Sequence, residues 1–190
     1  NIPENFGDGK HVFIDLFVRD DIQILNAVPT AEGAIAEAIN ETEKTLWRSK
    51  CLVIGFGRTG KALAFRLKAL GADVTISARK EKDFAEIAAF GFTPARSDRL
   101  CAVIKNSDIV FNTVPVLLIG EKELLAAQKE TLFIDLASKP GGIDFSAAEK
   151  TGLKVLRLLS LPGRTAPKTA GEIIAETVLR ILKGGETNGE

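Results

Sequence analysis

The stretch Val53-Ile54-Gly55-Phe56-Gly57-Arg58-Thr59-Gly60 constrains the fold of this chain more than any other part of the sequence. It follows a short apolar run, Cys51–Ile54, and precedes a helical pattern over Lys61–Leu70. A Gly-x-Gly-x-x-Gly motif is weak in isolation but specific between a strand and a helix, where it predicts a dinucleotide-binding turn. A glycine-rich turn without a ligand is the alternative.

Each glycine of this motif has a separate physical task. Gly55 allows the tight turn, Gly57 lets the backbone approach a pyrophosphate, and Gly60 lets the helix pack against the strand. The first amides of the following helix, at Arg58 and Thr59, then point at the phosphates, whose charge the helix dipole favours.

The end of the next predicted strand, Asp73–Ser77, indicates which dinucleotide binds. A site for NAD places an acid here to bind the ribose 2′-hydroxyl. This chain has Ser77, then Arg79 and Lys80, and no acid before Glu81. A hydroxyl and two cations suit a 2′-phosphate, so we predict NADP rather than NAD. A solvated Arg-Lys pair at the start of a helix is the alternative.

Composition excludes several other classes. The chain has 190 residues, enough for one domain, and its 25 basic and 25 acidic side chains cancel, which argues against nucleic acid as the main partner. No apolar run approaches the roughly 18 residues of a membrane helix, and the first residues show no signal-peptide pattern. Two cysteines without a spacing pattern, Cys51 and Cys101, indicate reduced thiols in a cytoplasmic protein, and a single histidine, His11, argues against a metal site.

Alternating strand and helix patterns follow from residue 49 onward. Repeated strand-helix-strand units require right-handed crossovers and a parallel sheet covered on both faces. Six strands at this spacing predict a doubly wound, Rossmann-type α/β fold with strand order 3-2-1-4-5-6. The predicted strands are Lys50–Ile54, Asp73–Ser77, Phe92–Pro94, Asp108–Asn112, Thr131–Leu136 and Leu153–Leu158.

The two ends of the chain are predicted to flank this sheet. A helical pattern over Ile22–Val28 is expected to stop at Pro29, after which Thr30 is a good N-cap for a helix over Ala34–Trp47. A closing amphipathic helix is expected over Thr169–Leu182. We therefore divide the chain into a linker or domain remnant (1–29), a nucleotide-binding domain with bridging helices at both ends (30–183), and a loose tail (184–190).

Ligands of such sheets lie at the carboxyl ends of the strands. The fourth strand ends in Asn112-Thr113-Val114-Pro115, where the proline holds the preceding residue extended and turns the chain over the nicotinamide side. The fifth is followed by Asp135–Gly142, whose small residues let a ligand approach the backbone near Ala137 while Lys139 supplies a cation. A plain turn and a solvated loop cation are the respective alternatives.

Two further positions are candidates for anion binding or proton transfer. The loop Leu161–Gly171 carries Arg164 and Lys168 and leads into a helix start at Thr169, which together form an anion site on physical grounds, or a rigid connector. Glu32 is a candidate proton acceptor, although an acid in a first helical turn is also favoured by the dipole alone.

Several motifs, taken together and in this order, resemble the A subunits of bacterial dipicolinate synthases. The resemblance covers about residues 15 to 182, and DLASKPGG combined with LPG…APKTAG is far more specific than the glycine motif. The segments that carry it are RDDIQILNAVPTAEGAI, GFGRTG, ISAR, NTVP, DLASKPGGIDF and LPGRTAPKTAG.

This resemblance implies oxidation of dihydrodipicolinate to dipicolinate with NADP, in the mother-cell cytoplasm during spore formation. It also implies a second, flavoprotein-like B subunit, while the oligomeric state, including a homo-oligomer, stays open. On this reading Lys139, Arg164, Lys168 and the amides at Thr169 hold the two substrate carboxylates. The nicotinamide and its ribose contact residues of the fourth and fifth strand ends. These are Asn112, Thr113, Val114, Pro115 and Ala137.

The proton acceptor and the completeness of the site stay open at this point. Glu32 and Lys139 are the candidates for the acceptor, and water would suffice because aromatisation drives the step. Members of the family carry about a domain's length before the RDD motif, so we expect a closing N-terminal domain to be missing and the chain to catalyse poorly alone. Two alternatives remain: an NADP-dependent dehydrogenase of another small carboxylate, since the PGxxxPxT loop is also similar to methylene-tetrahydrofolate dehydrogenases, and a non-catalytic nucleotide-binding subunit.

Overall fold

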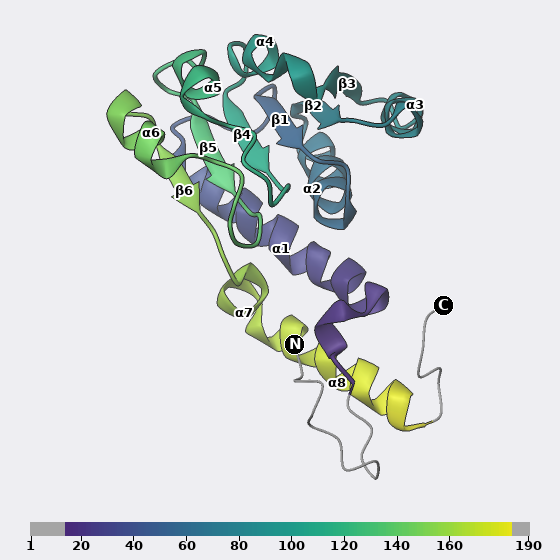
Figure 1. Ribbon diagram of the computed structural model, residues 1–190. Coiled ribbons are helices and arrows are strands. Elements are labelled where there is room, and N and C mark those ends of the chain that lie inside the picture. The colour runs from purple at the N-terminus through teal and green to yellow at the C-terminus, as the bar shows by residue number, and fades with distance from the viewer. Residues whose placement is uncertain (1–13, 184–190) are drawn as a thin grey trace.

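The structure, a computed structural model, describes residues 14–183. Six parallel strands form one sheet with the order β3-β2-β1-β4-β5-β6, which confirms the predicted doubly wound fold (Figure 1). The strands are β1 (Lys50–Ile54), β2 (Asp73–Ala78), β3 (Thr93–Arg96), β4 (Ile109–Asn112), β5 (Leu132–Asp135) and β6 (Val155–Arg157).

Helices cover both faces of the sheet because the central strands are apolar on both sides. Val53 and Phe111 pack on one face against α1, α2 and α3, whereas Leu52 and Phe133 pack on the other against α4, α5 and α6. Uninterrupted burial of β4 and β5 is the expected result for a parallel sheet between two helical layers. The helices are α1 (Asp20–Glu41), α2 (Arg58–Ala69), α3 (Glu81–Ala89), α4 (Leu100–Ile104), α5 (Glu121–Leu125), α6 (Phe145–Thr151), α7 (Leu161–Thr165) and α8 (Pro167–Leu182), with 3₁₀ turns at Leu16–Val18 and Ser97–Arg99.

The register brings the last residues of the strands into one row. Ile54 pairs with Ser77 on one side and with Asn112 on the other. Asn112 in turn pairs with Asp135, and Asp135 with Arg157. Loops that leave these positions therefore emerge together along one edge of the sheet, where the ligand is expected.

The helix α1 corrects two predictions made from the sequence. Pro29 lies inside it rather than ending it, and Thr30 is not an N-cap, because its hydroxyl donates to the Asn26 carbonyl oxygen at 2.7 Å. Proline removes one backbone donor from a helix, yet here the buried face of α1 compensates by packing against α2 and α7. A β-carbon on Gly33 would stand 2.6 Å from the hydroxyl of Thr165, which shows how closely α7 approaches.

The same helix alters the predicted division of the chain. The expected boundary between residues 29 and 30 falls within α1, which continues without a break from Asp20 to Glu41. The helix ends at Glu41 instead of Trp47, and Trp47 is exposed. His11 and the predicted tail 184–190 lie outside the described residues.

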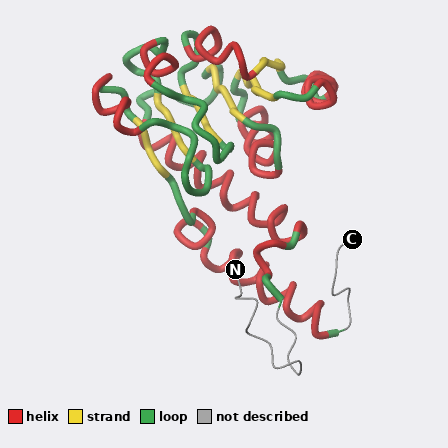
Figure 2. The backbone as a smooth tube through the Cα atoms, viewed as in Figure 1, coloured by secondary structure: helices red, strands yellow, loops and turns green. Residues whose placement is uncertain are grey.

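The C-terminal part of the chain also differs from the prediction. The loop expected before the last helix contains a short helix, α7, and α8 begins at Pro167 rather than at Thr169. Together α8 and the first turns of α1 form an arm that projects away from the sheet (Figure 1). Figure 2 shows that this arm is mostly helical, with the strands gathered at the other end of the molecule.

Candidate functional site

Two hollows open side by side at the carboxyl ends of the strands. The β2-side pocket has a volume of about 400 Å³ and the β5-side pocket about 570 Å³. They share Thr113 and Pro115, which stand between them at the point where the strand order reverses. This is where a doubly wound sheet binds its ligand. The β2-side pocket is lined by Ile54, Gly55, Phe56, Gly57, Ala78, Arg79, Lys80, Lys82, Asp83, Ser97, Thr113, Val114, Pro115, Val116 and Leu118.

The glycine turn has the geometry that a pyrophosphate requires. Gly55 has a φ of +100°, and a β-carbon on Gly60 would stand 2.1 Å from the Gly55 carbonyl oxygen, so neither position accepts a side chain. Gly57 is exposed, and an added β-carbon there would meet nothing within 4 Å. As N-cap of α2, Gly57 supplies no side chain to the first helical amides, which stay available to an anion.

The end of β2 presents cations to the β2-side pocket. Arg79 and Lys80 are exposed, and neither forms an ion pair within residues 14–183. Lys82 and Asp83, which were not predicted, line the pocket as well. The pocket is therefore positively charged overall, with one acid at its margin.

Ser77 does not reach this pocket as predicted. It is 1% exposed, and its hydroxyl lies 3.1 Å from the hydroxyl of Ser97. Ile76 and Ala78 on either side of it are buried as well, because both faces of the sheet are covered, so Ser77 is enclosed in the protein near the end of β2. Ser97 lines the pocket instead, and its hydroxyl donates to the Ala78 carbonyl oxygen at 2.9 Å. Sequence reasoning missed Ser97, although it directly follows the third strand.

Asn112 is also placed differently from the prediction. It is completely buried, and its amide nitrogen donates to Asp135 Oδ1 at 2.8 Å and to the Val114 carbonyl oxygen at 3.0 Å. Its oxygen accepts the backbone N–H of Val114 at 3.2 Å. With its donors and acceptor occupied inside the protein, Asn112 shapes the turn into Thr113–Pro115 rather than touching a ligand. Asp135, equally buried, was not singled out from the sequence.

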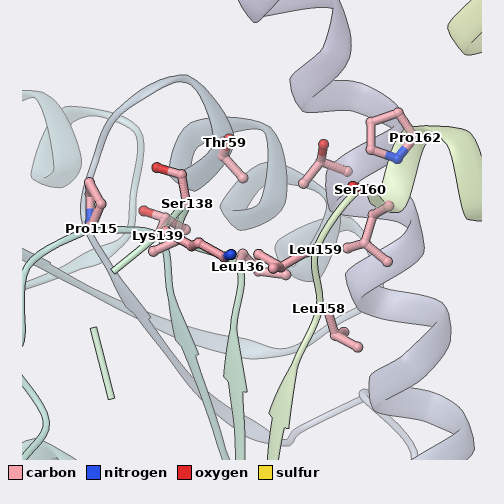
Figure 3. A pocket seen from close by; sticks show the side chains of 13 residues that line it. Thr59, Pro115, Leu136, Ser138, Lys139, Leu158, Leu159, Ser160 and Pro162 are labelled. Carbon is pink, nitrogen blue, oxygen red and sulfur yellow. The ribbon is translucent and has the colours of Figure 1, made fainter. Parts of the chain in front are cut away.

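The β5-side pocket brings together Thr113, Pro115 and Ala137, predicted beside the nicotinamide, and Lys139, predicted to bind the substrate. In Figure 3 the Lys139 side chain extends over the strand ends into the middle of the pocket. Lys139 forms no ion pair within residues 14–183 and is the pocket's sole cation among them. The lining residues are Thr30, Thr59, Thr113, Pro115, Leu136, Ala137, Ser138, Lys139, Leu158, Leu159, Ser160, Leu161 and Pro162.

Other predicted residues lie outside both pockets. Arg164 pairs with Glu37 of α1 at 3.8 Å, and Lys168, 90% exposed, lies 4.0 Å from Glu172. Thr169 is exposed in the first turn of α8. Arg164 lies outside the pockets because the short helix α7, which was not predicted, directs it towards α1. The start of α7 instead presents Ser160, Leu161 and Pro162 to the β5-side pocket.

Glu32 and Arg58 are engaged elsewhere. Glu32 lies in the middle of α1, where its carboxylate accepts from Arg66 Nε at 3.2 Å, so it is neither in a first helical turn nor at the pocket. Arg58 forms an ion pair with Asp20, which joins the start of α2 to the start of α1. Its backbone position in the first turn of α2 is unaffected by that pair.

Within residues 14–183, no group of three His, Cys, Asp or Glu side chains is placed so that it could hold a metal ion. In the same range no helix is both long enough and apolar enough to cross a bilayer.

Comparison with known proteins agrees with this geometry. The family described as "D-isomer specific 2-hydroxyacid dehydrogenase, NAD binding domain" matches residues 23–140. The chain belongs to this family. Its cofactor is accordingly a nicotinamide dinucleotide, and the domain is that of an oxidoreductase.

Individual relatives confirm the resemblance stated from the motifs. The A subunit of dipicolinate synthase from Bacillus subtilis (strain 168) is 43% identical over 173 residues, which are 91% of this chain and 58% of the relative. The crystal structure of the Bacillus subtilis A subunit has a TM-score of 0.88 at 43% identity, over 90% of this chain and 57% of that one. The crystal structure of the corresponding subunit from Bacillus halodurans has a TM-score of 0.87 at 42% identity, over 89% and 58%. The chain thus spans less than two thirds of the length of these relatives.

Proposed function

We propose that this chain is the cofactor-binding part of a dipicolinate synthase A subunit, which oxidises dihydrodipicolinate to dipicolinate with NADP. The observation that carries the proposal is the pair of pockets on either side of Thr113 and Pro115. One is cationic and adjoins the glycine turn, and the other contains a single lysine. The identity with the A subunits from two Bacillus species supports the substrate.

The choice of NADP rests on the end of β2. Arg79 and Lys80 line the β2-side pocket without an ion-pair partner in residues 14–183, and the strand ends in Ala78 rather than in an acid. A guanidinium and an ammonium there would meet a 2′-phosphate through charge-assisted hydrogen bonds. Ser97 lines this pocket where Ser77 was expected, but its hydroxyl donates to the Ala78 carbonyl oxygen, so the proposal for the 2′-phosphate rests on the two cations.

In the β5-side pocket we propose that Lys139 binds a carboxylate of the substrate. When bound, the nicotinamide would accept a hydride from the substrate ring. Thr113, Pro115 and Ala137 would form the wall beside it. The Lys139 ammonium would hold the ring carbon within reach of that wall. Water would accept the ring proton, because aromatisation drives the step.

The partner and the setting are part of the same proposal. The relatives carry the name of one lettered subunit of their synthase, which implies at least one other. We propose that this other is a flavoprotein-like B subunit, which works with this chain in the cytoplasm of the mother cell during spore formation.

Calorimetric titration of the chain with NADP⁺ and NAD⁺ tests the cofactor. We expect the wild type to prefer NADP⁺, and Arg79→Ala to weaken NADP⁺ binding about tenfold, as for loss of one hydrogen bond to a charged group, while NAD⁺ binding changes less than twofold. Lys129→Ala, which removes an exposed cation outside both pockets, is the control. Weak binding of both dinucleotides, unchanged in Arg79→Ala, would contradict the proposal.

A further inference from the structure

A buried carboxyl group lies directly beneath the β5-side pocket. Asp135 ends β5 and is 0% exposed. Its Oδ1 accepts from Asn112 Nδ2 at 2.8 Å and from the Ala137 amide at 3.2 Å, and its Oδ2 accepts from the Gly142 amide at 3.0 Å. These three donors belong to the end of β4 and to both ends of the loop that carries Lys139.

From these donors, further hydrogen bonds extend to the segment after β4, which forms the opposite wall of the pocket. Asn112 holds Val114 through two hydrogen bonds, which fixes the turn that leads to Pro115. The Gly142 carbonyl oxygen accepts the amides of Leu118 and Ile119, both at 3.0 Å. A β-carbon on Gly142 would stand 2.2 Å from Asn112 Nδ2, so the two segments touch without intervening space.

No ion pair accounts for the burial of Asp135. Within residues 14–183 no cationic nitrogen lies within 4.0 Å of its carboxyl oxygens, and Arg157, opposite it in β6, donates instead to the Pro140 carbonyl oxygen at 2.6 Å. A buried carboxyl group costs free energy unless hydrogen bonds satisfy it. Here three N–H groups do so, and all three belong to segments that form the pocket.

We propose that Asp135 is a positioning residue for the nicotinamide and substrate side of the site. Its carboxyl group joins the Thr113–Pro115 wall, through Asn112, to the 137–142 loop, and thereby sets the separation between Pro115 and Lys139. This inference rests on the proposed function for what the pocket binds. The joining of the two segments rests on the contacts alone.

The substitution Asp135→Asn tests this with little change in volume. An amide offers one acceptor atom where the carboxyl group offers two. Either orientation of the new side chain would therefore place its NH₂ group against an N–H donor, that of Gly142 or those of Asn112 and Ala137. The 137–142 loop would be released from β4, whereas the glycine turn and the end of β2 would keep their contacts.

The first measurement compares two ligands by calorimetry: NADP⁺ and 2′-phospho-ADP-ribose, which lacks the nicotinamide. For Asp135→Asn we expect the Kd of NADP⁺ to rise about tenfold, as for the loss of one charged hydrogen bond, and that of 2′-phospho-ADP-ribose to rise by a clearly smaller factor, because its proposed pocket is lined by the Thr113–Pro115 turn but by no residue of the 137–142 loop. Gly142→Ala should act in the same direction. Asp108→Asn is the matched control, because Asp108 accepts the Lys50 amide at 2.8 Å at the opposite edge of the sheet. Equal effects on both ligands, or none, would overturn the proposal.

Amide hydrogen exchange without any ligand is the second measurement. We expect Asp135→Asn to accelerate exchange in residues 113–119 and 137–142 together, and Asp108→Asn to leave both segments unchanged. If only one segment, or neither, exchanges faster, Asp135 does not join them. If the wild type binds neither NADP⁺ nor NAD⁺, the proposed function fails, while hydrogen exchange still decides whether the two segments are joined.

Discussion

Gly60 lies so close to Gly55 that an added β-carbon would stand 2.1 Å from the Gly55 carbonyl oxygen. Gly57, between them in sequence, faces open space. The same motif therefore contains one glycine that the fold requires and another that leaves open the space in which we propose the pyrophosphate binds. The two can be separated by substitution.

We expect Gly60→Ala to lower the free energy of unfolding by about 2 kcal/mol or more, as for overpacking of a core. Gly57→Ala should leave that free energy within about 0.5 kcal/mol, because its φ of −80° suits alanine, yet weaken dinucleotide binding. Urea denaturation and calorimetry measure the two effects. Equal loss of stability in both variants would contradict the distinction between a structural role for Gly60 and a ligand-binding role for Gly57.

Lys139→Met should weaken binding of dipicolinate, the product expected in the β5-side pocket. We expect about a tenfold rise in its Kd, measured with NADP⁺ present, because one charged hydrogen bond is lost. The Kd of NADP⁺ itself should change less than twofold. Lys105→Met, at an exposed position outside the pocket, is the control. An unchanged affinity for dipicolinate would show that Lys139 does not bind it.

Asp108 predicts a dependence of stability on pH. Burial alone would raise the pKa of Asp108, but hydrogen bonds from Lys44 Nζ and the Lys50 amide outweigh it and hold that pKa below the ordinary value of 3.8. A carboxyl group with a depressed pKa in the folded state stabilises the fold above its unfolded pKa, and this contribution is lost as the pH falls through the folded value.

Urea denaturation of wild type and Asp108→Asn from pH 7 to pH 2.5 measures this effect. We expect the wild type to be more stable by about 1 kcal/mol at pH 7, with the difference shrinking below about pH 4. A difference that is constant with pH would show that Asp108 stabilises the fold through packing rather than through its charge.

The two cysteines should differ in their reaction with a thiol reagent. Burial raises the pKa of Cys51 to about 12, and the side chain is 1% exposed. Burial also raises the pKa of Cys101, as does its hydrogen bond to Glu123, but this residue is partly exposed. With Ellman's reagent at pH 8 we expect one thiol, that of Cys101, to react slowly in the native chain. In urea both thiols should react. Rapid reaction of two native thiols would contradict this.

The strand order could be predicted because the central strands are apolar on both faces and each crossover helix follows at a regular spacing. The glycine motif then located the ligand edge at the end of β1. The pocket residues of the Thr113–Pro115 turn and of the loop around Lys139 could be named from this rule alone, because they directly follow strand ends.

The side-chain directions could not be predicted in the same way. Asn112 is the last residue of β4 and Ser77 the last but one of β2, yet both point into the protein, where hydrogen bonds to Asp135 and Ser97 satisfy them. Pro29 looked like the end of a helix because local sequence does not show that α1 is supported by packing along its length. Arg164 was misplaced since a turn of helix, α7, rotates it towards Glu37.

The Thr113–Pro115 turn borders both pockets, and this has a thermodynamic consequence. An occupant on one side that shifts the turn changes the affinity on the other side by some factor. The second occupant must then change the affinity for the first by the same factor, because linkage between two sites is reciprocal. For any such pair of occupants the two affinities are not independent quantities, and each is defined only at a stated concentration of the other.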